Sequence, residues 1–300
     1  QSSAILSGCV TCAGIAPIAR MSQTLTPIGD SMVVIGVISA VVAAIYAVFE
    51  RESGRALGWS SVSQLGIAIL SPTYACIYAM QHGICKALLF STLRSGDQPE
   101  MALNSHSAPA PGHGHGSVDE PRPLPVEELI RVIVFVVASL SIMGFPLLSG
   151  FVTKNWVKTD LPYEAKIIYT TAALLTSTVY ARLIFDRASN YFSGSGFKAG
   201  LSINSLKINR ALIDCLSTPR IWIFLISIVS LIGFSFAQPD VYSLNSINSA
   251  IVSAVLGGIL FVSVVGIQAD EFVKPITRTL DLVGAPFLVA ALLLANLLYL

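Results

Sequence analysis

The chain has 300 residues, of which 54% are hydrophobic and only 12% are charged, and its formal net charge is +1. Ordinary soluble domains carry about 25% charged residues, so this composition excludes a large water-soluble protein and predicts a membrane protein. The near-neutral charge gives no indication of nucleic-acid binding.

A membrane-spanning helix needs ~20 mostly apolar residues. The sequence contains eight such stretches and a ninth apolar run near its last residue. Since every backbone polar group inside a bilayer must be satisfied internally, we expect an all-α fold, a polytopic transmembrane helical bundle. In chain order, the predicted helices are Ser3–Ala19, Ile28–Phe49, Arg55–Leu70, Thr73–Arg94, Glu127–Leu148, Glu164–Phe185, Pro219–Ala237, Ile247–Ile267 and Leu280–Leu300.

Two polar segments divide these helices into groups. Residues 95–126 form a polar loop rich in proline and histidine, and residues 187–218 form a polar connector that carries several basic side chains. We therefore expect transmembrane helices over 1–94, a broken-helix region and its following helix over 127–186, and further transmembrane helices over 219–300.

A break is predicted near the end of the fifth helix, at Gly144, Pro146 and Gly150. Proline cannot donate a backbone hydrogen bond and clashes with the preceding turn. Broken helices at membrane depth survive only where they are buried in protein or line a wet cavity. Lys154 follows the break, where it either lines an ion path or reaches from a helix end to the membrane surface.

The fourth predicted helix carries His82 and Lys86 deep within its apolar length. A charged side chain at the bilayer centre costs about 3 kcal/mol or more, so such a lysine usually marks a polar route. The two residues are four positions apart and share one helix face. A desolvated lysine can exchange its proton near neutral pH, and a histidine passes protons in the same range, so the pair suits a proton relay. Alternatively, His82 is a hydrogen-bonded packing residue.

A polar stripe in the third predicted helix consists of Ser60, Ser61, Ser63 and Gln64. Such side chains either bond across helices as structural contacts or hold ordered water on a route. The Cys9-x-x-Cys12 pair fits small-residue packing better than a redox or zinc site. No nucleophile–base set, phosphate loop or cofactor motif is evident, so we expect no metal, no cofactor and no catalytic residues in the chain alone.

Three stretches occur in a fixed order: RALGWSSVSQLG (Arg55–Gly66), HGICKALLF (His82–Phe90) and GFPLLSGFVTKNWV (Gly144–Val157). They resemble motifs of the antiporter-like proton-translocating membrane subunits of complex I, the type I NAD(P)H/ferredoxin–quinone oxidoreductases, and of Mrp-type cation/proton antiporters. Ser3–Arg20 and Ala172–Phe185 are similar to neighbouring helices of that family. The resemblance covers roughly Ser3–Asp186.

The resemblance implies a proton pathway through His82, Lys86 and Lys154. Lys86 is similar to the central lysine of the pathway, His82 to the histidine beside it, and Lys154 to the exit-side lysine of the broken helix. The family's mechanism is proton translocation through water-linked half-channels, coupled to redox chemistry in other subunits. The Glu and Lys of the family's first half would lie before Gln1, so a neighbouring subunit is expected to supply that half-channel.

We therefore expect a proton- or cation-translocating subunit of a complex I-like or Mrp-like assembly, surrounded by lipid and other membrane subunits. Such a chain is not an enzyme by itself, but it can belong to a proton-translocating oxidoreductase. Two alternatives stay open: a non-conducting scaffold in an antiporter-like position, and a part of a proton-coupled inorganic-carbon uptake complex. The expected location is a bacterial inner or thylakoid membrane, with the inner mitochondrial membrane as the alternative.

Overall fold

The computed structural model describes residues 13–24, 26–93, 125–193 and 219–265, and these residues form helices without any β-strand. The predicted all-α fold is therefore confirmed. The predicted C-terminal helix Leu280–Leu300, Cys9 and Cys12, and most of the polar segments 95–126 and 187–218 lie outside the described residues. The α-helices are α3 (Ile15–Thr24), α4 (Thr26–Phe49), α5 (Ser53–Leu70), α6 (Ala75–Thr92), α7 (Pro125–Met143), α8 (Ser149–Asp160), α9 (Tyr163–Ser193), α12 (Pro219–Phe236) and α13 (Leu244–Val265).

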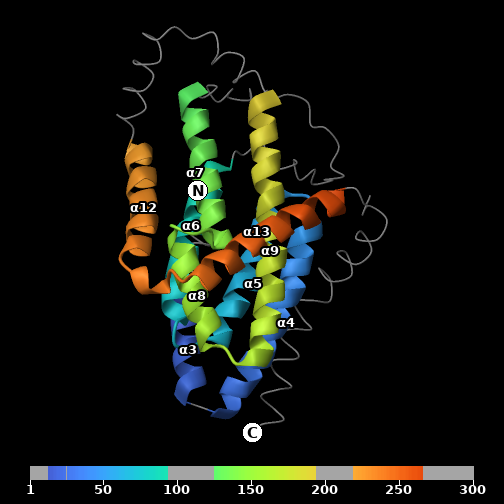
Figure 1. Cartoon of the computed structure of the whole chain (residues 1–300), viewed down its shortest axis with the longest axis vertical. Coiled ribbons are helices and arrows are strands. Elements are labelled where there is room, and N and C mark those ends of the chain that lie inside the picture. The colour runs from blue at the N-terminus through green and yellow to red at the C-terminus, as the bar shows by residue number, and fades with distance from the viewer. Residues whose placement is uncertain (1–12, 25, 94–124, 194–218, 266–300) are drawn as a thin grey trace, which may run out of the picture.

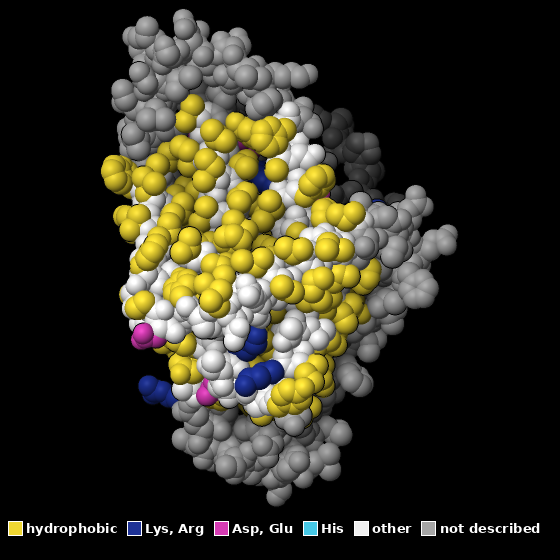
Figure 2. Space-filling model, in the orientation of Figure 1, with side chains coloured by type: hydrophobic (Ala, Val, Ile, Leu, Met, Phe, Trp, Pro, Cys, Tyr) yellow, Lys and Arg dark blue, Asp and Glu magenta, His cyan; other side chains and the backbone are white. Residues whose placement is uncertain are grey.

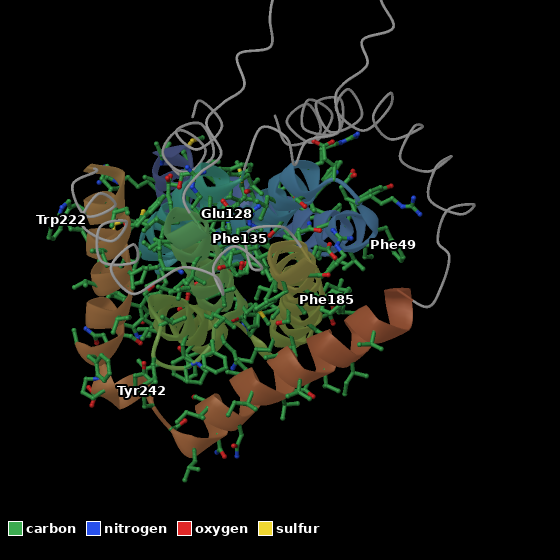
Figure 3. All side chains as sticks on the ribbon, turned by 90° about the horizontal axis from the view of Figure 1, so that it is seen from above. Phe49, Glu128, Phe135, Phe185, Trp222 and Tyr242 are labelled. Carbon is green, nitrogen blue, oxygen red and sulfur yellow. The ribbon has the colours of Figure 1, made fainter. Side chains whose placement is uncertain are left out.

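The helices α4, α5, α6, α7 and α9 form a bundle, and α12 and α13 lie at its outside (Figures 1 and 3). Trp222, which is 54% exposed, lies on the outer side of α12 (Figure 3). Helix α13 crosses α9 obliquely (Figure 1). The two helices are close at Gly257, where an added Cβ would lie only 2.5 Å from the Cβ of Ser177. A short 3-10 turn, Pro239–Val241, links α12 to α13.

The outer surface of the bundle is suited to lipid. Hydrophobic side chains cover most of the described face in Figure 2, and few charged side chains interrupt them. Three described helices are long and apolar enough to cross a membrane, within Ser31–Phe49, Ala165–Phe192 and Leu244–Val262. Apart from Phe49 at the end of α4, the exposed large hydrophobic side chains of α4 and α13, such as Val34 and Val262, are aliphatic, as expected for a lipid-facing surface.

Helix α9 continues past the predicted end at Phe185 to Ser193. The guanidinium of Arg187 lies in this extension, is only 8% exposed, and contacts the carboxylate of Glu128 at 2.9 Å. It also donates to the carbonyl oxygen of Thr92 at the end of α6. A cation at a helix C-terminus is favourable, so this arginine ties α9 to both α6 and α7.

Helices α4 and α5 approach closely through two glycines. A Cβ added to Gly66 would lie 2.7 Å from both the backbone nitrogen of Ala40 and the carbonyl oxygen of Gly36. Ser63 strengthens the contact, since its hydroxyl donates to the carbonyl oxygen of Ala40 at 2.7 Å. Small residues at helix contacts in membranes allow this approach of backbones.

We expect the substitution Gly66→Ala to lower the free energy of unfolding by about 1–3 kcal/mol, because the new methyl group meets backbone atoms that cannot rotate away. Thermal unfolding of the purified protein in detergent would measure the change. Gly58→Ala is the matched control on the same helix, since a Cβ at Gly58 meets nothing within 4 Å. Equal unfolding midpoints for the two variants would contradict the prediction.

Candidate functional site

Two hydrophobic clusters lie one above the other along the helices. The first contains Leu57 of α5, Leu89 of α6 and Leu183 of α9. The second contains residues nearer the other ends of the same three helices: Ile67, Ala75, Ala79 and Ala172. Polar side chains that are less than 9% exposed occupy the levels between the two clusters on all three helices: Ser60, Ser61, Ser63, Gln64, Gln81, His82, Thr176, Ser177 and Thr178. We call these nine residues, together with Lys86, the polar layer.

Lys86 belongs to this layer and is fully buried, with 0% exposure. Its Nζ donates to the carbonyl oxygen of Leu57 at 2.6 Å and lies 5.5 Å from the centre of the Tyr180 ring. The same carbonyl oxygen accepts a hydrogen bond from the Ser61 hydroxyl at 3.1 Å. The lysine is therefore held inside the bundle against α5 and does not reach the membrane surface.

His82 lies one helical turn before Lys86, as the spacing predicts, and is 2% exposed. Its Nε2 atom is buried and has no hydrogen-bond partner among the described residues. Since buried polar atoms are normally paired, an unpaired imidazole nitrogen in this layer is a group that can still accept or donate a proton.

The polar stripe of α5 reaches across to α9 and α6. Ser60 Oγ and the Tyr180 hydroxyl are 3.0 Å apart, and the Gln64 amide donates to Thr176 Oγ1 at 2.8 Å. The Tyr78 hydroxyl donates to the side-chain oxygen of Gln64. These bonds make the stripe a cross-helix network, which is the structural alternative predicted for it, and they also connect exchangeable hydroxyl groups within one layer.

The predicted helix break is present between α7 and α8. Gly144 has a φ of +85°, which glycine adopts without steric cost. Its N–H donates to Ser141 O at 3.0 Å and the N–H of Phe145 donates to Leu140 O at 3.0 Å, the pair of bonds that defines a Schellman C-cap. After Pro146, α8 begins in close contact with α7. A Cβ added to Gly150 of α8 would lie only 1.7 Å from the carbonyl oxygen of Ser141 in α7.

Lys154 lies beside this break and is 7% exposed. Its side chain crosses the open face of Gly144, where an added Cβ would lie 2.8 Å from Lys154 Cδ. Its Nζ donates to Met143 O, one of the last carbonyls of α7, at 3.2 Å. The sequence left two positions possible for the Lys154 amine, inside the protein or at the membrane surface. In the structure the amine lies inside the protein.

Hydroxyl and amide groups connect the level of His82 with the break. The Gln81 amide donates to Ser141 Oγ at 3.1 Å, and Ser141 Oγ lies 3.5 Å from Ser149 Oγ at the start of α8. Sequence reasoning missed Gln81, Ser141, Thr176 and Tyr180. The available signal was their position as polar residues inside apolar stretches, but their partners follow only from helix packing.

The described residues contain no group of three or more His, Cys, Asp or Glu side chains that could hold a metal ion. The layer contains an amine, an imidazole and several hydroxyl groups, and all of these groups are able to exchange protons. Lys86 and His82 are its titratable side chains, and Lys154 is a further one beside the broken helix.

Several named proteins share part of the sequence. NADH-ubiquinone oxidoreductase chain 5 of Metridium senile is 26% identical over 246 residues, which is 73% of this chain and 38% of that protein. The chloroplastic NAD(P)H-quinone oxidoreductase subunit 5 of Mesostigma viride is 26% identical over 277 residues, or 87% of this chain and 41% of that protein. The corresponding protein of Chlorokybus atmophyticus is 26% identical over 174 residues, or 55% of this chain and 25% of that protein. The chain thus spans well under half the length of these relatives.

The transmembrane domain family described as NADH:quinone oxidoreductase/Mrp antiporter matches residues 1–178. The match includes α3, α4, α5, α6, α7 and α8, and therefore His82, Lys86 and Lys154 together with the helix break. It confirms the family resemblance of the three motifs. The chain is an integral membrane protein, and it belongs to the NADH:quinone oxidoreductase/Mrp antiporter transmembrane family.

Proposed function

We propose that this chain translocates protons, or another monovalent cation, as a membrane subunit of a complex I-like or Mrp-like assembly. The observation that carries the proposal is the polar layer, in which a buried histidine with an unpaired Nε2 lies between two hydrophobic clusters and a fully buried lysine lies beside the first of them. Burying an ionisable group inside a membrane protein costs free energy, and such groups usually mark an ion or proton pathway.

The proposed pathway runs from Lys86 and His82 toward Lys154. Gln81, Ser141 and Ser149 supply polar atoms between the level of His82 and the helix break. The break leaves α7 carbonyls such as Met143 O available to the Lys154 amine, and irregular backbone at membrane depth is typical of ion sites. We propose that Lys154 receives the proton from the layer and releases it toward one membrane face.

Other membrane subunits are part of the proposal. The relatives are named as subunits of quinone oxidoreductases, which supports a place in a multisubunit complex for this chain. Redox or cation-exchange chemistry would then occur in neighbouring chains, and a neighbour would supply the entry half-channel. The alternative role is that of a scaffold subunit that does not conduct protons, and the following experiment distinguishes the two roles.

The substitution Lys154→Gln is expected to slow proton translocation by the reconstituted assembly about tenfold, since a positioned proton-transfer group contributes at least this much. Acidification of the vesicle lumen, followed with a pH-sensitive dye, would measure the rate. Lys166→Gln on α9 is the control, because Lys166 lies outside the polar layer and the break. Equal rates in the two variants would favour the scaffold role over conduction through Lys154.

A further inference from the structure

A cavity of about 50 Å³ lies beside the broken helix, next to Lys154, and most of its lining residues have no part in the proposed proton pathway. Its wall comes from α8, from α9 and from one face of α13, with the end of α7 closing it. A water molecule needs about 10–15 Å³ of such space, so the cavity has room for a small ion or a few waters. Its polar lining residues are Lys154, Asn155, Lys158, Tyr169, Thr170, Ser246, Ser249 and Ser253.

Two lysines and no carboxylate line the described wall of this cavity. The lysines are Lys154 and Lys158, and no aspartate or glutamate is among the described lining residues. Lys158 Nζ donates to Ser249 Oγ at 2.9 Å, and Lys154 Nζ donates to Met143 O. Both acceptors are neutral, so these bonds satisfy one donor on each amine and leave both amines without a carboxylate partner among the lining residues.

Some hydroxyl groups of the wall already donate a hydrogen bond within the protein, and others have a proton left to donate to a ligand. Tyr169, Thr170 and Ser253 donate theirs to backbone carbonyls. Ser246 Oγ accepts from Ser243 at 2.8 Å, and Ser249 Oγ accepts from Lys158, so both keep their own O–H available. The spacing of three residues puts these two serines on one face of α13, and the Asn155 amide adds further donors.

We propose that this cavity binds a small monovalent inorganic anion of about the size of chloride. Two lysine amines, two available serine hydroxyls and an amide supply donors to one small space, and the described wall supplies no carboxylate to repel an anion. A hydrogen bond to a charged partner is about twice as strong as a neutral one, which favours an anion over water. The proposal does not depend on proton translocation by the chain.

Chloride-35 NMR line broadening of the assembly in phosphatidylcholine nanodiscs would test the site, with chloride as the probe and bromide as the competitor. We expect saturable broadening in the unmodified protein. Lys158→Gln and Ser249→Ala should weaken the chloride affinity about tenfold and severalfold respectively. Lys158→Arg keeps the charge and should retain most of the broadening, which separates loss of charge from loss of folding. Lys166→Gln, outside the cavity wall, should bind as the unmodified protein does.

Absence of saturable broadening in the unmodified protein would overturn the proposal, since the cavity would then hold only water. Equal chloride affinity in Lys158→Gln and Lys166→Gln would also overturn it. Chloride binding that disappears when anionic lipid is added would indicate that a lipid headgroup competes for the same donors. That result would support the anion-binding chemistry of the wall while assigning its physiological occupant to the lipid.

Discussion

Replacing Lys86 with methionine is expected to lower proton translocation by the assembly about 100-fold, the lower end of what positioned proton-transfer groups contribute. Methionine fills similar volume without an exchangeable proton. The amine that it removes is fully buried and donates a hydrogen bond to the carbonyl oxygen of Leu57. Dye-monitored lumen acidification in vesicles, at equal amounts of assembled protein, would measure the rate.

Loss of activity in Lys86→Met is not expected to result from misfolding, because replacing a buried charge by an apolar group of similar size is often neutral or stabilising. Lys86→Arg serves as the second variant. Arginine keeps the positive charge but does not deprotonate in proteins, so it should also abolish translocation. Full activity of the arginine variant would show that charge, and not proton exchange, is what this position provides. Wild-type rates in the methionine variant would remove Lys86 from the pathway.

Replacing Gly150 with alanine is expected to prevent stable packing of the broken helix, with a cost of at least about 3 kcal/mol. The added Cβ would lie 1.7 Å from Ser141 O and 2.7 Å from Ser141 C, and both are backbone atoms. Relief requires α8 to move away from α7, which would also separate Ser149 from Ser141 and shift Lys154. The yield of assembled protein and its thermal unfolding midpoint would measure the effect.

Gly233→Ala on α12 is the matched control for this change, because a Cβ at Gly233 meets nothing within 4 Å. Alanine also has the higher helix propensity, so the control should assemble at least as well as the unmodified chain. If Gly150→Ala assembled and unfolded as Gly233→Ala does, the close contact of α7 with α8 would be wrong as described.

The helices could be predicted because apolar length is a direct sequence signal, and charged or proline residues mark their ends. Arg55–Leu70 was predicted where α5 covers Ser53–Leu70, and Phe49 was predicted as the last residue of α4. The extension of α9 to Ser193 was missed, because its last turns are polar and depend on the contact of Arg187 with Glu128. Such a contact joins residues from different helices and leaves no local pattern.

In the candidate site, the features that follow from local sequence could be predicted, and the contacts between helices could not. The spacing of four residues put His82 and Lys86 on one face, and the Gly-Phe-Pro sequence located the break, because both follow from local geometry. The partners of these groups did not follow. Leu57 O, Tyr180 and Ser141 approach the site from other helices, so their roles depend on the packing of the bundle.

The position of the polar layer between two hydrophobic clusters also determines how the chain would sense voltage. Low-dielectric regions carry most of an applied electric field, so the membrane potential would fall mainly across the two clusters. A full crossing is worth about 2.3 kcal/mol per unit charge at 100 mV, and a proton that reaches His82 from either face would have crossed only one of the two barriers. Protonation of this histidine would therefore respond to membrane voltage as well as to pH.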